Sequence, residues 1–172
     1  PWLADVPLRF RVNSGYSKTD ETVFFRGRKV SGYNSEEVNY GFGLDRAITE
    51  KLHWYQNLYT YSQPRIFGLV GTAEANNVPE KYRIATVGST FIYEDRNNIF
   101  NPSKGFMLSS SVEYAAPFLG SDSNAHFVII RQDFYNYYSL TPNVVLALAI
   151  NYAKLWGLGN SSGVPLTKRL TL

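Results

Sequence analysis

Residues 144–156 read Val144-Val145-Leu146-Ala147-Leu148-Ala149-Ile150-Asn151-Tyr152-Ala153-Lys154-Leu155-Trp156. Bulky apolar side chains occupy every second position from Val144 to Ile150, and small or polar side chains fill most of the positions between them. Side chains on a β-strand point to opposite faces with a period of two, whereas a helix would scatter this pattern around its axis. The stretch therefore predicts a strand with one bulky apolar face and one face of small residues.

Alternation of this kind recurs along the chain. In residues 106–114, bulky apolar side chains alternate with mainly polar ones, and residues 6–13 and 38–45 show a weaker version of the pattern. Tyr, Phe, Ile and Val are also frequent in three segments whose two faces are mixed, so that their register stays open: residues 52–66, 82–95 and 124–138. We expect seven strands in an all-β, antiparallel arrangement.

The connections between these strands alternate in length. Outer-membrane barrels have short turns at one end and longer loops at the other. In chain order we expect a long polar link at 18–34, a tight turn at 48–51, a long loop at 67–81, a medium turn at 96–104, a loop at 117–123, a tight turn at 139–143 and a Gly/Ser-rich tail after residue 156. This order favours a transmembrane β-barrel.

Composition narrows the class of protein. Aromatic residues make up 16% of the chain, which suits strands and membrane interfaces, and a mean hydropathy of −0.23 is too polar for a helical membrane protein. Cysteine is absent, which excludes disulfides and Cys-ligated zinc and suits a chain that crosses an oxidising periplasm. The net charge of +3 comes from scattered residues without a basic block, so we expect no nucleic-acid binding.

A soluble antiparallel β-sandwich is the alternative fold, because it also alternates and turns frequently. Two features favour the membrane barrel. The strands look about 12 to 15 residues long, where strands of globular proteins run about 5 to 6. Aromatic residues also gather near the expected strand ends, as at Trp54-Tyr55, Tyr137-Tyr138 and Trp156, where an interfacial girdle would lie.

The most specific motif of the chain lies in residues 93–105 and consists of Asp95, Arg96, Phe100, Pro102 and Gly105. It resembles a turn in the barrels of the BamA/TamA-type outer-membrane protein insertase superfamily, which reads approximately Asp-Arg, a short spacer, and Phe-Pro-Thr-x-Gly. The match departs at two places, because Asn101 separates the Phe from the Pro and Ser103 replaces the Thr. Pro and Gly predict a turn on their own, and we expect the Asp-Arg pair to brace it.

The resemblance extends to other parts of the chain. Residues 113–124 look like the strand and hairpin loop that follow the turn in the family, residues 1–8 are similar to its periplasmic link into a strand, and residues 164–170 resemble the approach to its sixth extracellular loop. The resemblance implies that residues 1–172 are a fragment of one transmembrane β-barrel domain of about sixteen strands. We expect the periplasmic POTRA domains and the first and last barrel strands to lie outside this fragment.

The resemblance also implies a function. A BamA-like protein of the bacterial outer membrane folds and inserts other outer-membrane proteins and is not an enzyme. The implied partners are outer-membrane lipid, unfolded outer-membrane protein substrates and the lipoproteins of an assembly complex, and no cofactor is implied. The alternatives are a passive outer-membrane pore or structural barrel, a TamA-like translocation factor and a barrel hydrolase.

A barrel of this kind places one face of each strand in lipid. We expect seven bulky side chains to face lipid: Phe106, Leu108, Val112, Val144, Leu146, Leu148 and Ile150. Arg131 and Asp133 lie two residues apart on one expected strand and therefore share a face, which we expect to line the lumen.

The hydrolase alternative needs a nucleophile and an acid/base group near the rim of the barrel. The chain has two histidines, His53 and His126, and His126 lies near Asp122 and Ser123 at an expected loop. A histidine near a strand end is far more often solvated than catalytic, so we expect no catalytic residue. Adjacent carboxylates at 36–37 and 94–95 point to opposite faces of a strand, so we expect no metal site either.

Overall fold

The computed structural model describes residues 8–25, 28–67 and 81–158. Within these ranges the chain forms one antiparallel sheet, whose strands lie side by side in the order in which they occur in the sequence. A single turn of 3-10 helix, η3 (Pro117–Leu119), follows the fifth strand. The strands are β1 (Arg9–Phe25), β2 (Arg28–Ala47), β3 (Leu52–Phe67), β4 (Ile84–Glu94), β5 (Gly105–Ala115), β6 (Phe127–Thr141) and β7 (Val144–Gly157).

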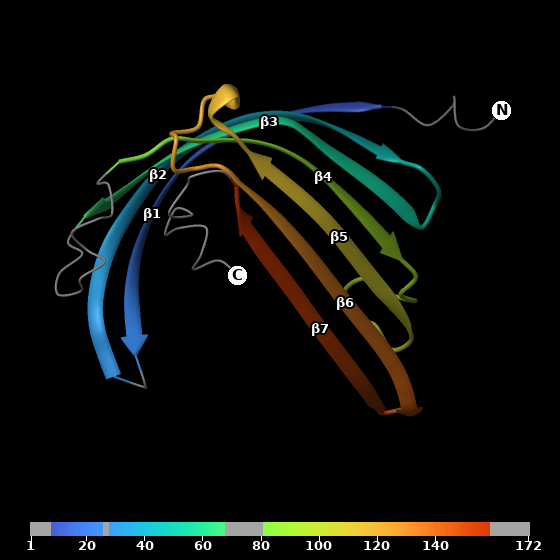
Figure 1. Cartoon of the computed structure of the whole chain (residues 1–172). Helices are drawn as coiled ribbons and strands as arrows, with labels where there is room; N and C mark the ends of the chain where they lie inside the picture. The colour runs from blue at the N-terminus through green and yellow to red at the C-terminus, as the bar shows by residue number, and fades with distance from the viewer. Residues whose placement is uncertain (1–7, 26–27, 68–80, 159–172) are drawn as a thin grey trace.

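The sheet curves into an arch with a concave and a convex side (Figure 1). All the described strands belong to this one sheet, so the seven-stranded all-β prediction is confirmed and the sandwich alternative is wrong. Among the described strands, β1 pairs only with β2 and β7 pairs only with β6, which leaves one backbone edge of each without a strand partner. The described residues contain no helix that is both long and apolar enough to cross a bilayer.

The expected long polar link at 18–34 is wrong. Outside residues 26 and 27, this segment is the far part of the β1–β2 hairpin, with Lys18 opposite Glu36 and Phe25 opposite Arg28. An ion pair of 3.3 Å joins Lys18 Nζ to Glu36 Oε1 across the two strands. Residues 18–22 and 26–29 are almost all polar, so the sequence there lacks the alternation that identifies a strand with one apolar face.

The turns at one end of the sheet follow the prediction. Residues 48–51 connect β2 to β3, residues 95–104 connect β4 to β5, and residues 142–143 connect β6 to β7. At the opposite end, residues 116–126 link β5 to β6 and contain η3. The expectations for residues 1–7, for most of the loop at 67–81 and for the tail from 159 onward lie outside the described residues.

Two irregularities explain why the faces of β3 looked mixed. The pairing shifts between Phe42 and Gly43 on the β2 side and between Asn57 and Thr60 on the β4 side. An extra residue on one strand reverses the faces of everything beyond it, so a fixed period of two fails across the shift. Leu58 lies within this irregular segment and is exposed.

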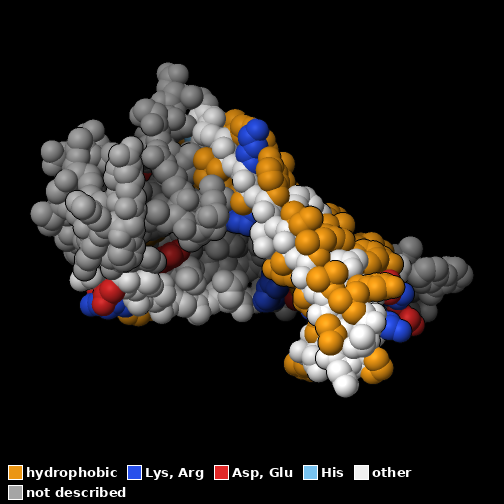
Figure 2. Space-filling model, turned by 90° about the horizontal axis from the view of Figure 1, so that it is seen from below, with side chains coloured by type: hydrophobic (Ala, Val, Ile, Leu, Met, Phe, Trp, Pro, Cys, Tyr) orange, Lys and Arg blue, Asp and Glu red, His pale blue; other side chains and the backbone are white. Residues whose placement is uncertain are grey.

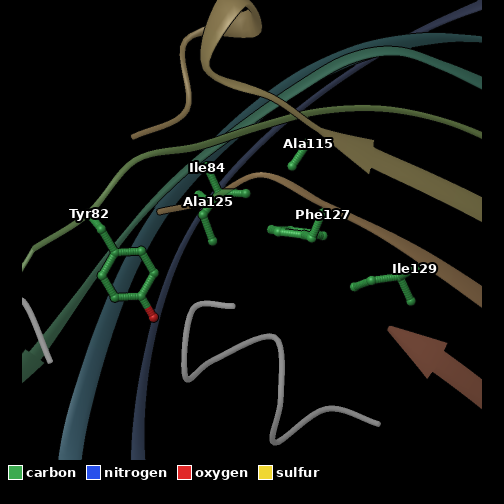
Figure 3. Close-up of a cluster of buried hydrophobic side chains, with 6 residues drawn as sticks. All are labelled: Tyr82, Ile84, Ala115, Ala125, Phe127 and Ile129. Atoms are coloured by element: carbon green, nitrogen blue, oxygen red, sulfur yellow. The ribbon is translucent and has the colours of Figure 1, made fainter. Parts of the chain in front are cut away.

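One apolar cluster is buried on the concave side of the sheet (Figure 3). It lies at the end of the sheet where β4 and β6 begin and β5 ends, and partly buried Leu155 of β7 packs against it. Its members are Tyr82, Ile84, Ala115, Ala125, Phe127 and Ile129. The cluster explains the mixed face of β6, because Phe127 and Ile129 share that face with Arg131 and Asp133.

Removal of the largest ring in this cluster should destabilise the sheet. Phe127 is fully buried, so Phe127→Ala should lower the free energy of unfolding by about 3–5 kcal/mol through lost burial and a residual cavity. Phe118, which is 78% exposed, offers the control, and Phe118→Ala should cost less than about 1 kcal/mol. Urea unfolding of the intact protein in lipid vesicles measures both, and equal losses would contradict the assignment.

Candidate functional site: a two-faced sheet and its turn rim

The two faces of the sheet differ sharply in chemistry. The cross-strand pairing and the period of two assign each side chain to the concave or the convex face. The concave face carries polar and charged residues along most of its length: Arg11, Asn13, Glu37, Asn39, Asp45, Asn57, Ser109, Ser111, Glu113, Arg131, Asp133 and Asn151. The convex face is mainly bulky and apolar.

The seven side chains predicted to face lipid all lie on the convex face. On β7, Leu146, Leu148 and Ile150 are 56%, 50% and 53% exposed, so they are not in a dry core between two sheets. Figure 2 shows hydrophobic side chains gathered along the limb that β6 and β7 form. Phe106 is half-buried, because its ring stacks on Tyr93 at 5.4 Å and packs against Phe134 at 6.1 Å.

Hydrogen bonds and ion pairs cross the strands on the concave face. Arg131 Nη1 lies 3.4 Å from Glu113 Oε2, and Asn151 Nδ2 donates to Asp133 Oδ1 at 2.7 Å. Arg131 and Asp133 therefore share the polar face, as their spacing predicted. At the other limb, Arg11 pairs with Asp45 at 3.1 Å and donates to Asn57 Oδ1 at 3.0 Å. Such groups suit an aqueous or hydrogen-bonded environment.

The motif turn between β4 and β5 depends on Gly105. Its backbone has a φ of +95°, in the region that residues with a Cβ rarely adopt. A Cβ built on Gly105 would lie 2.0 Å from the carbonyl oxygen of Asp95, so the two backbone segments can approach only because the side chain is absent. This close contact extends the backbone hydrogen bonds between β4 and β5 into the turn, where the Asp95 amide donates to Phe106 O at 2.9 Å.

Asp95 and Arg96, which we expected to brace the turn, bind different partners. Asp95 instead accepts a hydrogen bond from Lys51 Nζ of the neighbouring turn at 2.5 Å. Arg96 holds Glu94 with two bonds of 2.7 and 2.6 Å. The Asp95 hydrogen bond raises the pKa of the Lys51 ammonium, and the Glu94 hydrogen bond raises the pKa of Arg96. Asp95 therefore links two turns of the rim, while Arg96 holds Glu94 at the start of its own turn.

Two asparagines that the sequence analysis missed shape the turn. Asn97 Oδ1 accepts from the amides of Ser103 and Lys104, both at 3.0 Å, and Asn98 Oδ1 accepts from the Phe100 amide at 2.9 Å. Short amide side chains commonly replace backbone partners in turns, so the Asn-Asn pair next to Asp-Arg was a usable signal.

The remaining motif residues hold the rim together less directly. Ser139 of β6 donates to the carbonyl oxygen of Ser103 at 2.8 Å, which ties the β4–β5 turn to the end of β6. Pro102 lies in the same turn and is partly buried. Phe100 is 98% exposed, so its ring does not take part in holding the turn in shape.

The residues that a hydrolase would need are engaged elsewhere. Asp122 accepts two bonds from the Arg83 guanidinium at 2.9 and 2.8 Å, and this contact raises the pKa of Arg83. His126 Nε2 lies 3.3 Å from Tyr114 Oη. Asp122 is thus bound by Arg83, and His126 lies against Tyr114. Within the described ranges, no group of three or more His, Cys, Asp or Glu residues could hold a metal ion.

Comparison with known protein families shows to which family the chain belongs. The model of the Omp85 superfamily domain matches residues 1–172, the whole of the chain. The chain belongs to the Omp85 superfamily. No curated protein and no solved structure matches it. The predicted membership in the BamA/TamA-type superfamily is thereby confirmed.

Membership in the Omp85 superfamily establishes several properties. The chain is part of an integral outer-membrane β-barrel protein, and proteins of the family are non-enzymatic insertases and translocases. Its general function is therefore outer-membrane protein assembly or translocation. Strands of the Omp85 domain cross the membrane, so a sheet with one apolar and one polar face meets the demand of that environment.

Gly105 of this Omp85 domain should not tolerate any side chain. Gly105→Ala should lower the free energy of unfolding by more than about 3 kcal/mol, because backbone strain adds to overlap with the Asp95 carbonyl. Gly120 has a φ of +109°, but a Cβ there would meet only ordinary contacts at 3.6 Å and beyond.

The matched variant Gly120→Ala should therefore cost only about 1–2 kcal/mol. Urea unfolding in vesicles compares the two variants. Equal losses would show that the close backbone approach at Gly105 does not limit stability.

Proposed function

We propose that this Omp85 domain is part of a BamA-like factor that folds other outer-membrane proteins and inserts them into the membrane. The observation that carries the proposal is the turn from Asp95 to Gly105. Its order of residues is close to that of the BamA/TamA type, and Gly105 lies where a Cβ would overlap the Asp95 carbonyl oxygen. A generic pore would need the two-faced sheet but not this turn.

The free energy of transferring each face of the sheet into lipid indicates how the sheet is oriented in the membrane. Bulky hydrocarbon side chains on the convex face gain by contact with lipid, whereas the Arg, Asp and Glu side chains of the concave face would lose their solvation there. We therefore place the convex face in lipid and the concave face, with Arg131 and Asp133, toward an aqueous lumen. The lipid-facing set comprises Phe106, Leu108, Val112, Val144, Leu146, Leu148 and Ile150.

Further strands must complete the barrel. Each unpaired backbone group in hydrocarbon costs several kcal/mol, so the free edges of β1 and β7 require partners. In a barrel of about sixteen strands, β1 to β7 would form the wall opposite the seam where the first and last strands meet. Periplasmic POTRA domains would belong to the same protein.

Insertion then needs no chemical step. A seam that opens sideways offers an edge to which a substrate strand adds through backbone hydrogen bonds. The substrates would be unfolded outer-membrane proteins, and lipoproteins of an assembly complex would be further partners. The continuous ladder from β1 to β7 supports a role as the stiff part of the barrel against which the seam moves.

The placement in lipid predicts a difference between adjacent residues of β7. Ile150 lies on the convex face near the middle of the strand, and Ala149 lies on the concave face. Ile150→Arg should lower the free energy of unfolding in vesicles by about 2–4 kcal/mol, whereas Ala149→Arg should cost less than about 1 kcal/mol. The reverse order would place the concave face in lipid and contradict the proposal.

Reconstitution tests the function itself. The intact protein in phospholipid vesicles should speed the folding of an added, urea-denatured outer-membrane barrel protein relative to protein-free vesicles. The altered gel mobility of the folded substrate measures the rate. Ion leakage without faster folding would indicate a passive pore, and export of a passenger without insertion would indicate a TamA-like translocation factor.

A further inference from the structure

Polar residues occupy the centre of the convex face, where apolar residues are expected. The convex side of β4 carries Ala85, Val87, Ser89, Phe91 and Tyr93. The convex side of β5 carries Phe106, Leu108, Ser110, Val112 and Tyr114. In both strands a serine takes the middle position, with two larger or apolar residues on either side.

The neighbouring strands continue this feature. Gln56 of β3 is opposite Ser89, and Gln132 of β6 is opposite Ser110. Ser110 Oγ donates to Gln132 Oε1 at 2.6 Å, and Trp54 Nε1 donates to Ser89 Oγ at 2.8 Å. We call Gln56, Ser89, Ser110 and Gln132 the central polar row. It crosses four adjacent strands in the middle of the sheet, with a stagger of two residues between β4 and β5, where Ser89 is opposite Val112 and Ser110 is opposite Phe91.

The hydrogen bonds of the row are incomplete. Gln132 uses its carbonyl oxygen for Ser110, and within the described part of the chain its Nε2 amide has no hydrogen-bond partner. An acyl chain cannot accept a hydrogen bond, so this amide would lose its water without compensation if the convex face lies in lipid. The serines are also smaller than exposed Phe91, Leu108 and Val112 around them, which lets another surface approach the row.

We propose that the central polar row is the contact through which two copies of this protein associate in the membrane, convex wall against convex wall. The inference rests on the placement of that face in lipid. A primary amide both donates and accepts, so Gln132 can pair with the same glutamine of a second copy across a two-fold axis. The row carries no charge, so it needs no partner of opposite charge.

The position of the row also favours face-to-face association. It spans β3 to β6, whereas the unpaired backbone edges belong to β1 and β7. Contact through the row would therefore leave both edges free for the strands that close each barrel. The side chains alone, rather than an added strand, would hold the two copies together.

Cross-linking in membranes tests the contact. In outer membranes that hold the intact protein, Val112→Cys should form a disulfide between two copies on mild oxidation, because exposed Val112 lies opposite Ser89 beside the row and its replacement leaves the row intact. Leu148→Cys lies on the same convex face away from the row and should form at least about five-fold less of this product. Equal yields from the two positions, or a Val112→Cys product with a different protein, would overturn the proposal.

A second variant separates association from folding. Gln132→Leu keeps a similar size but removes the amide, so it should lower the association constant in vesicles by about five-fold, measured by co-localisation of two fluorescent labels. Gln63→Leu changes a convex glutamine of β3 outside the row and should leave association unchanged. An unchanged association constant for Gln132→Leu would overturn the proposal. The rate of substrate insertion, measured separately, reports on the proposed function.

Discussion

Backbone hydrogen bonding between adjacent antiparallel strands is the constraint on which the structure depends. In hydrocarbon, an amide or carbonyl without a partner is too costly to persist, so strands can cross only as parts of a continuous ladder. The six strand pairs from β1–β2 to β6–β7 meet this demand, and the β4–β5 turn extends its ladder to Asp95 and Asn97. Gly105 is essential to that extension, because its backbone lies too close to the backbone of Asp95 to leave room for a side chain.

Because successive side chains point to opposite faces, each paired strand presents apolar side chains on one side of the sheet and polar side chains on the other. The bulky residues of β7 turn to the convex side, and Asn151 turns to the concave side, where it reaches Asp133. The separation is incomplete. Phe127 and its neighbours bury an apolar cluster on the polar side, and Ser110 with Gln132 places polar atoms on the apolar side, where the register also puts Arg46 and Lys154.

The sequence alone predicted the strands whose two faces carry clearly different side chains. β5 and β7 alternate cleanly because one of their faces is bulky and the other small or polar, and the motif at Gly105 identified a turn. It could not predict the outer part of the β1–β2 hairpin, because the sequence there is rich in Lys, Arg, Asp and Glu and does not alternate. The shift between Asn57 and Thr60 likewise reversed the pattern of β3 without a local signal. At the rim, the bond from Lys51 to Asp95 joins residues 44 apart in sequence, and only the fold brings them together.

The order of the strands has a consequence for how the chain acquires its structure. Every strand pairs with the strand that precedes it, so each new pairing closes a loop no longer than one connection. Short loops cost little entropy to close, and topologies dominated by local pairing fold faster than those that must bring distant segments together. The strands can therefore pair one after another from the β1–β2 hairpin onward. Each paired strand then provides the backbone edge to which the next strand adds.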